Sequence, residues 1–133
     1  MLRERLERMS QLARESQPLM PAVIKAFQEK LAAKLAEAGA APSDERVHQE
    51  VVLYAARIDV DEELSRLATH ITEFRRVLDK GGTCGKRLDF LCQELNREAN
   101  TLGSKSVSND LTRISVELKV LIEQMREQVQ NIE

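Results

Sequence analysis

The sequence is short of the residues that build turns, sheets and aromatic cores. Its 133 residues include no tryptophan, one tyrosine, three phenylalanines, five glycines and three prolines. Many tight turns would need more glycine and proline, so this composition argues against a fold of short strands and hairpins. Alanine, leucine, glutamate, arginine, glutamine and lysine dominate instead, and all of them favour helices. The expected fold class is therefore all-α.

Further absences narrow the classes of function. No apolar run approaches the roughly 20 residues of a membrane span, and the start of the chain, which alternates charge and leucine, is no signal peptide. The net charge of −2 excludes a uniformly basic surface, so contact with nucleic acid would require a local patch. Cys84 and Cys92 have neither metal-ligand nor redox spacing and are interpreted as structural. No Walker loop, nucleophile elbow, zinc pattern or aromatic stacking platform is found.

Apolar residues recur at helical spacing along almost the whole chain. The spacing predicts helices over residues 2–16, 21–38, 44–80, 86–102 and 107 to near the C-terminus. Within 44–80 the apolar pattern slips by one residue at 59–63, which predicts a break or kink recapped by an aspartate. Pro18 and Pro21 interrupt the first helical stretch, and an antiparallel helix pair is expected there. The prediction is a helical hairpin over 1–43 and a bundle over 44–133, with five to six helices in all.

The predicted helix ends carry recognisable capping residues. Ser43 or Asp44 is expected to cap the helix that follows it, and Ser106 or Ser108 to cap the last helix. Gly81, Gly82 and Gly85 predict a loop that can serve as a hinge. The last helix has a 4-3 apolar seam from Val107 to Ile132, which predicts packing against a partner helix.

The stretch Arg87–Ser106 is unusually rich in carboxylate, amide and guanidinium groups opposite its leucine stripe. A step of about 100° per residue places Glu94 and Glu98 on one flank of that stripe. The same step places Glu63 and His70 on one flank of the preceding helix. If the two helices pack side by side, these four residues converge at the edge of the core.

Carboxylates and one imidazole from facing helices are how helical bundles hold divalent cations, and such a set favours Mn²⁺ or Mg²⁺. A plain alternative stays open. Glu94 and Glu98 can belong to a solvated face in which Arg97, Lys86 or Arg87 forms ordinary salt bridges. His70 can equally be a boundary histidine with satisfied hydrogen bonds.

Basic residues cluster around the glycine loop and can neutralise phosphates of a nucleic acid, although most charge runs of this size are solvated faces. The cluster contains Arg75, Arg76, Lys80, Lys86 and Arg87, with Arg97 and Lys105 as extensions.

Three segments together resemble the C-terminal domain of the YicC/YloC family. They are IDVDEELSRLATHITEFRRVL, GKRLDFLCQELNREANTLGSKS and VELKVLIEQMREQVQNIE, and the resemblance spans residues 49–133. The first matches the family at Asp59, Asp61, Glu62, Glu63, Arg66 and His70. The second matches at Gln93, Glu94, Asn96, Arg97, Glu98, Asn100, Thr101, Ser104 and Lys105. Family members carry an additional N-terminal domain of strands and helices, so the chain is expected to derive from a longer parent.

The resemblance implies a cytoplasmic, metal-dependent endoribonuclease that assembles as a ring-like homo-oligomer, a hexamer for the full-length protein. Glu63, His70, Glu94 and Glu98 would then be the catalytic residues and metal ligands. RNA would be held by Arg66, Arg75, Arg76, Lys86, Arg87, Arg97 and Lys105. The isolated chain is expected to cleave poorly. The alternative is a non-catalytic helical oligomerisation or adaptor module whose functional surface is the seam from Val107 to Ile132.

Overall fold

The protein folds entirely into helices in the part of the chain that the structure describes. That structure is a computed structural model, and it describes residues 1–37, 39 and 44–132. The helices are α1 (Leu2–Ser16), α2 (Leu19–Glu37), α3 (Asp44–Ile58), α4 (Asp61–Lys80), α5 (Gly85–Lys105) and α6 (Asn109–Ile132). The predicted all-α class, with a hairpin and a bundle, is confirmed.

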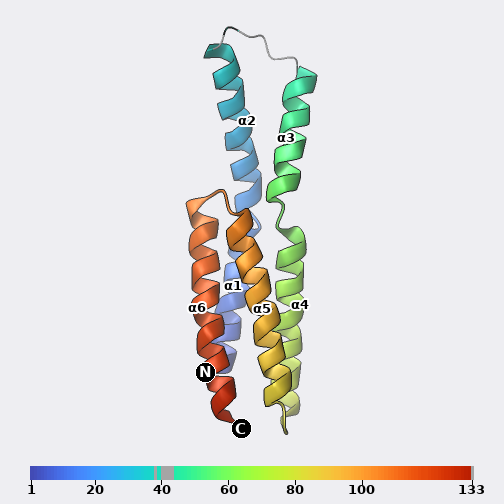
Figure 1. Ribbon diagram of the computed structural model, residues 1–133, viewed down its shortest axis with the longest axis vertical. Coiled ribbons are helices and arrows are strands. Elements are labelled where there is room, and N and C mark those ends of the chain that lie inside the picture. The colour runs from blue at the N-terminus through green and yellow to red at the C-terminus, as the bar shows by residue number, and fades with distance from the viewer. Residues whose placement is uncertain (38, 40–43, 133) are drawn as a thin grey trace.

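Four helices, α1, α4, α5 and α6, form an antiparallel bundle, and α2 and α3 form a hairpin that extends from one end of it (Figure 1). α2 continues the direction of α1, and α4 continues the direction of α3. The molecule therefore consists of two long interrupted helices, α1–α2 and α3–α4, and two shorter ones, α5 and α6.

The predicted pairing of the first two helices is wrong, because α1 packs in the bundle against α4 and α6. The hairpin consists of α2 and α3. Gln17, between α1 and α2, keeps helical dihedral angles, φ −58° and ψ −48°, so the chain does not turn back there. The missing amide donor of Pro18 interrupts the hydrogen-bond ladder without reversing the chain. The proposed domain boundary at residue 43, with Ser43 as a possible cap, lies outside the described residues, as does the side chain of Asp44.

The break predicted within 44–80 is confirmed at Asp59 and Val60, between α3 and α4. The Asp61 amide donates a hydrogen bond to Asp59 Oδ1 over 2.9 Å, which closes a turn just before α4. The N-cap residue of α4 is Val60 and has no side-chain cap bond, so the predicted aspartate cap is wrong. Val60 is fully buried and anchors the break in the core.

At the other end of α4, Gly81 adopts φ +71°, a conformation that glycine allows at a helix end. Its amide donates to the Val77 carbonyl, and the predicted glycine loop follows. Gly85, expected in that loop, is instead the first residue of α5.

The core is one continuous apolar cluster between the four bundle helices. α1 contributes Leu6, Met9 and Leu12, and the larger share comes from the predicted stripes of α4, α5 and α6. From Leu111 to Val129 the α6 seam packs on α1 and α5 of the same chain, so this part is not a free surface for another molecule; the side chain of Ile132 lies outside the described residues. Val107 is the exception, because it precedes α6 and is half exposed.

Polar contacts set how α6 meets its neighbours. Ser108 caps α6, because its Oγ accepts a hydrogen bond from the Leu111 amide over 3.1 Å. The Arg8 guanidinium of α1 donates two hydrogen bonds, of 2.6 and 3.1 Å, to the Glu117 carboxylate of α6. That two-pronged geometry holds α1 in register along α6.

The hairpin of α2 and α3 is more thinly packed than the bundle. None of the α2 residues is buried; a stack of Phe27 on Tyr54, with ring centroids 3.8 Å apart, joins the two helices. No helix in the described parts of the chain is long and apolar enough to cross a membrane.

We expect Leu118→Ala to lower the free energy of unfolding by about 2–5 kcal/mol, because it opens a cavity at a fully buried position of α6. Val120→Ala, at a half-exposed position of the same helix, should change it by less than about 0.5 kcal/mol. Urea unfolding followed by circular dichroism measures both values. Equal losses in the two variants would contradict the assignment of the seam to the core.

Candidate functional site

Two carboxylates are buried at the contact between α4 and α5. Glu63 of α4 is 4% exposed and Glu98 of α5 is 3% exposed, and they are the only buried charged residues in the described ranges. An ionised carboxylate loses several kcal/mol of hydration when it leaves water, so each of them requires a compensating partner. In both cases that partner comes from the opposite helix.

The partner of Glu63 is Lys105, at the last turn of α5. The Lys105 ammonium donates to Glu63 Oε1 over 2.8 Å and to the Asp59 carbonyl over 3.0 Å. The Asp59 carbonyl is available because the chain is not helical between α3 and α4. Glu63 Oε2 is also buried, and within the described structure it has no hydrogen-bond partner. Lys105 therefore links the C-terminal end of α5 to the α3–α4 break, through the Asp59 carbonyl, and to the buried Glu63 carboxylate, through Oε1.

The partner of Glu98 is Arg66, one turn further along α4 than Glu63. An Arg66 guanidinium nitrogen lies 3.7 Å from Glu98 Oε2, and the same guanidinium forms a short ion pair with Glu62 on its own helix. The two buried carboxylates thus follow each other along the line where α4 meets α5, called the α4–α5 groove from here on, and each has a cation of this chain as counter-charge.

Glu94 and His70 lie further along the same groove, but the four predicted residues are not gathered into one cluster. Glu94 is partly exposed and has only a loose ion pair with Arg97, at 3.8 Å. His70 is half-buried and lines a hollow of the groove whose lining includes none of Glu63, Glu94 and Glu98. Within the described residues, no three His, Cys, Asp or Glu side chains lie close enough together to hold a metal ion.

Most of the predicted RNA-binding cations already have acidic partners. Arg76 and Arg87 both contact Glu73, at 2.6 and 3.6 Å, while Lys86 is exposed and has no ion pair within the described part of the chain. Arg75 differs from the others, because it contacts Glu7 of α1 at 3.0 Å. It therefore faces the groove between α1 and α4, and the predicted basic patch divides over two grooves.

The cations around Glu73 shift its ionisation. The pKa of the Glu73 carboxyl is lowered from 4.5 to about 2, first because Arg76 donates hydrogen bonds to it. The charges of Arg76 and Arg87 add to the shift, while desolvation opposes it. Glu73 is therefore a fixed anion at neutral pH and a poor candidate for a proton donor.

The cysteines were expected from their spacing to be structural, and Cys92 lies in the apolar core. Cys92 is buried, and burial raises the pKa of its thiol to about 12, so it is neither a nucleophile nor a thiolate ligand at neutral pH. Among the remaining matched polar residues of α5, Gln93, Asn96, Asn100 and Ser104 are exposed and Thr101 is partly exposed.

The sequence reasoning missed one exposed aromatic residue in the groove. Phe90 of α5 is 46% exposed, and the Arg87 guanidinium lies over its ring, 5.4 Å from the centroid. A signal was available, because Phe90 falls outside the stripe of Leu88, Leu91 and Leu95 on a helical wheel.

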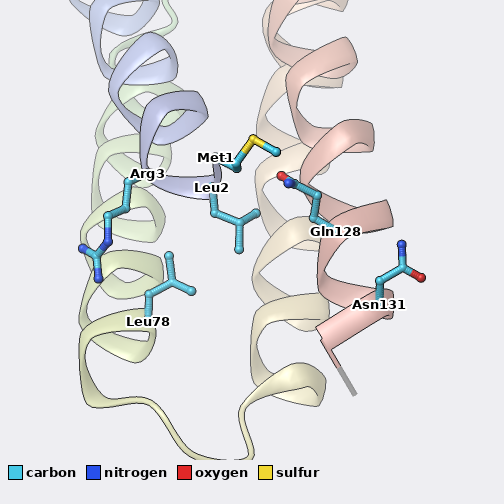
Figure 2. Close-up of a pocket in the computed structure, with 6 residues that line it drawn as sticks. All are labelled: Met1, Leu2, Arg3, Leu78, Gln128 and Asn131. Atoms are coloured by element: carbon cyan, nitrogen blue, oxygen red, sulfur yellow. The ribbon is translucent and has the colours of Figure 1, made fainter.

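A different hollow lies at the far end of the bundle, where the chain's first residues meet the end of α6. Figure 2 shows Leu2 and Leu78 pointing into it, with Gln128 and Asn131 on the α6 side. Its lining has no acid–base pair, and its one cation, Arg3, is bound to Asp79 at 2.6 Å. The groove between α4 and α5 is therefore the candidate site.

Comparison with known proteins places most of the chain in one family. Residues 16–133 match the family model described as "Endoribonuclease YicC-like, C-terminal". Over 114 residues the chain is 54% identical to "Probable endoribonuclease YicC" of Haemophilus influenzae, which covers 86% of this chain and 40% of that protein. A protein of the same name from Clostridioides difficile is 40% identical over 114 residues, covering 84% of this chain and 39% of its own length. The chain thus spans about two fifths of these curated relatives.

We expect Lys105→Met to lower the free energy of unfolding by about 1–3 kcal/mol, because it leaves the buried Glu63 carboxylate without a counter-charge. The double variant Glu63→Leu/Lys105→Met should recover part of that loss. Arg97→Met is the matched control, since its ion pair is exposed and should contribute less than about 0.5 kcal/mol. Urea unfolding of these proteins, together with wild type and the single variant Glu63→Leu, gives the coupling between Glu63 and Lys105. Additive effects of the two site substitutions would refute it.

The lowered pKa of Glu73 predicts a pH dependence with a definite sign. Its folded value, about 2, lies below the ordinary value of 4.5, so the ionised form favours the fold. The stability advantage of wild type over Glu73→Gln should therefore be complete above pH 4.5 and disappear as the pH falls towards 2. Unfolding measured across this range tests it, and carboxyl NMR of Arg76→Gln should show the Glu73 pKa rising. An advantage that persists unchanged at pH 2 would contradict the assignment.

Proposed function

The chain belongs to the YicC-like endoribonuclease C-terminal family, and on that premise we propose that it contributes the α4–α5 groove to an enzyme that cleaves RNA phosphodiester bonds. The proposal concerns a larger protein, because the relatives that bear the name are about two and a half times as long as their matched part. In that protein the groove would bind the RNA backbone and present its buried carboxylates to the scissile phosphate.

The observation that carries the proposal is the pair of buried carboxylates, Glu63 and Glu98, each opposed by a cation from the facing helix. Well-packed apolar residues would often stabilise such a contact as well as ion pairs do, so stability alone gives little reason for them. In phosphodiester cleavage, carboxylates can act as bases and cations can stabilise the negative charge on the phosphoryl oxygens.

Cleavage of a phosphodiester needs a base to take the proton of the attacking oxygen and positive charge to stabilise the negative charge that develops on the phosphoryl oxygens. Glu63 Oε2 has no partner in the described structure, so Glu63 is the proposed base; because that oxygen is buried, bound RNA would have to open the α4–α5 contact to reach it. Lys105 and Arg66 would supply positive charge beside it. Glu98 would hold Arg66 in position.

The expected divalent cation, Mn²⁺ or Mg²⁺, stays a proposal that rests on the family resemblance. The four ligands proposed for it, Glu63, His70, Glu94 and Glu98, do not fit a metal in the described arrangement, because no three of them lie within reach of one ion. At Glu63 a metal would also have to displace the Lys105 ammonium. No step of the mechanism is therefore assigned to it.

A homo-oligomer, a hexamer in the full-length protein, and a cytoplasmic location are likewise proposed from the resemblance. Exposed apolar residues of α3, Val52 and Leu53, support the first of these, because they offer surface for a subunit contact. The alternative function, a non-catalytic adaptor, would use an exposed surface such as this hairpin, since the α6 residues from Leu111 to Val129 that form the seam pack within the chain.

Glu63→Gln and Glu98→Gln test the proposal in a chimera in which this chain replaces the matching segment of the Haemophilus influenzae relative. We expect each to slow cleavage of a labelled single-stranded RNA by about a hundredfold or more, because a base or its positioning partner is lost. Glu127→Gln, at an exposed position of α6, is the matched control and should cleave at the wild-type rate. Circular dichroism confirms that all variants are folded.

Wild-type cleavage by both site variants would refute the catalytic groove and favour the adaptor. The metal is tested separately in the same experiment by adding EDTA and then Mn²⁺: loss of cleavage with EDTA and its return with Mn²⁺ would support a divalent cation. A Mn²⁺ titration of the chain with Glu94→Ala and Glu98→Ala then tests the ligands. Full activity in EDTA would remove the metal from the proposal and leave the endoribonuclease.

A further inference from the structure

The hollow between α4 and α5 that contains His70 is distinct from the pairs at Glu63 and Glu98. It has a volume of 580 Å³ and is open to solvent along one side. Small-molecule sites in proteins have volumes of about 300–1,000 Å³, so a nucleobase and its sugar fit. Phe90 and Arg87 form one wall from α5, while Thr69, His70 and Glu73 form the other from α4.

Phe90 is the unusual member of this set. The chain has four aromatic residues, of which Phe74 is fully buried and Phe27 and Tyr54 stack on each other in the hairpin. Phe90 alone is exposed over nearly half its surface, between the fully buried neighbours Leu88 and Leu91. An aromatic ring exposed within a polar groove can stack on any base, because every base has a π face.

The charges around Phe90 fit a nucleotide. Arg76 and Arg87 share the single carboxylate of Glu73, which leaves one positive charge in excess, and Lys86 next to Arg87 adds another. Arginine guanidinium planes also stack on unpaired bases, so Arg87 and Phe90 can hold one base together.

The threonine hydroxyls of the α4 wall have a defined polarity. Thr69 Oγ1 donates its hydrogen bond to the Ser65 carbonyl, and Thr72 Oγ1 donates to the Ala68 carbonyl. Since their hydrogens are used in these bonds, the two hydroxyl oxygens can only accept hydrogen bonds. An exocyclic amino group on a base edge is a donor that would suit them.

We propose that this hollow is a nucleobase subsite, in which one unpaired base of single-stranded RNA stacks on Phe90 and Arg87 while Arg76 and Lys86 face the adjoining phosphate. The subsite rests on the proposed function for its ligand class. It adds Phe90 as a substrate-binding residue at a distance from Glu63 and Glu98. It also requires the RNA in the groove to be single-stranded.

The test measures binding of a fluorescein-labelled oligoadenylate to the 133-residue chain by fluorescence anisotropy, in wild type, Phe90→Leu and Phe90→Tyr. We expect Phe90→Leu to weaken binding about tenfold or more, because base stacking on an aromatic ring is lost. Phe90→Tyr should bind like wild type, since it keeps the ring. Val116→Ala, at an exposed apolar position of α6, should also bind like wild type.

A matched abasic oligonucleotide separates stacking from a change in protein structure. It keeps the phosphates and lacks the bases, so wild type and Phe90→Leu should bind it equally. Equal affinity of the two proteins for oligoadenylate, or an equal loss on the abasic strand, would overturn the subsite.

Light scattering covers the other possible occupant, a second copy of the chain. A change of oligomeric state in Phe90→Leu without a change in RNA affinity would overturn the proposal in favour of a subunit contact. If the subsite proposal fails, the expected effect of Glu63→Gln and Glu98→Gln on cleavage still stands, so this failure and that of the proposed function are distinguishable.

Discussion

The contact of the Lys105 ammonium with Glu63 and the Asp59 carbonyl is the interaction on which the arrangement of the groove depends. It joins the last turn of α5 to the point where α3 ends and α4 begins, and so it fixes how the two helices are aligned along their length. With that alignment set, Arg66 meets Glu98 and Arg87 meets Glu73 further along the same antiparallel pair. Because a buried carboxylate without a partner costs several kcal/mol, a shift of one turn between α4 and α5 would be expensive.

The fold could largely be predicted from sequence because helical periodicity is a local property. The stripes of α4, α5 and α6, the break at Asp59 and the Ser108 cap all follow from spacing and residue type. The direction of α2 relative to α1 did not, since it depends on whether Gln17 keeps helical angles between the two helices, and a proline nearby permits either outcome. Val107 was assigned to the seam because spacing alone does not show where α6 begins.

The sequence predicted which flank of each helix carries the site residues, but not which cations pair with the carboxylates. A helical wheel placed Glu63, His70, Glu94 and Glu98 on facing flanks, and the structure buries two of the four. The helical wheel could not show that Lys105 and Arg66 form the ion pairs with these carboxylates. Which long side chains meet depends on how α4 and α5 are aligned along their length, and a wheel of one helix does not contain that alignment. The exposure of Phe90 was within reach of the same wheel, and it gives the groove a stacking surface that the motif residues lack.

The two helix breaks give the molecule a joint. α1 passes into α2, and α3 into α4, at the same end of the bundle, so the α2–α3 hairpin is attached through two short breaks in the helices (Figure 1). At 1.5 Å per residue, the 19 residues of α2 reach about 28 Å beyond that point, so a rotation of about 10° displaces the hairpin tip by roughly 5 Å. One of the breaks contains the Asp59 carbonyl that Lys105 holds. A change in the charge of Glu63 would alter the Lys105 contact at the α3–α4 break. Because the hairpin is long, a small rotation at that break would displace its far end by several ångströms.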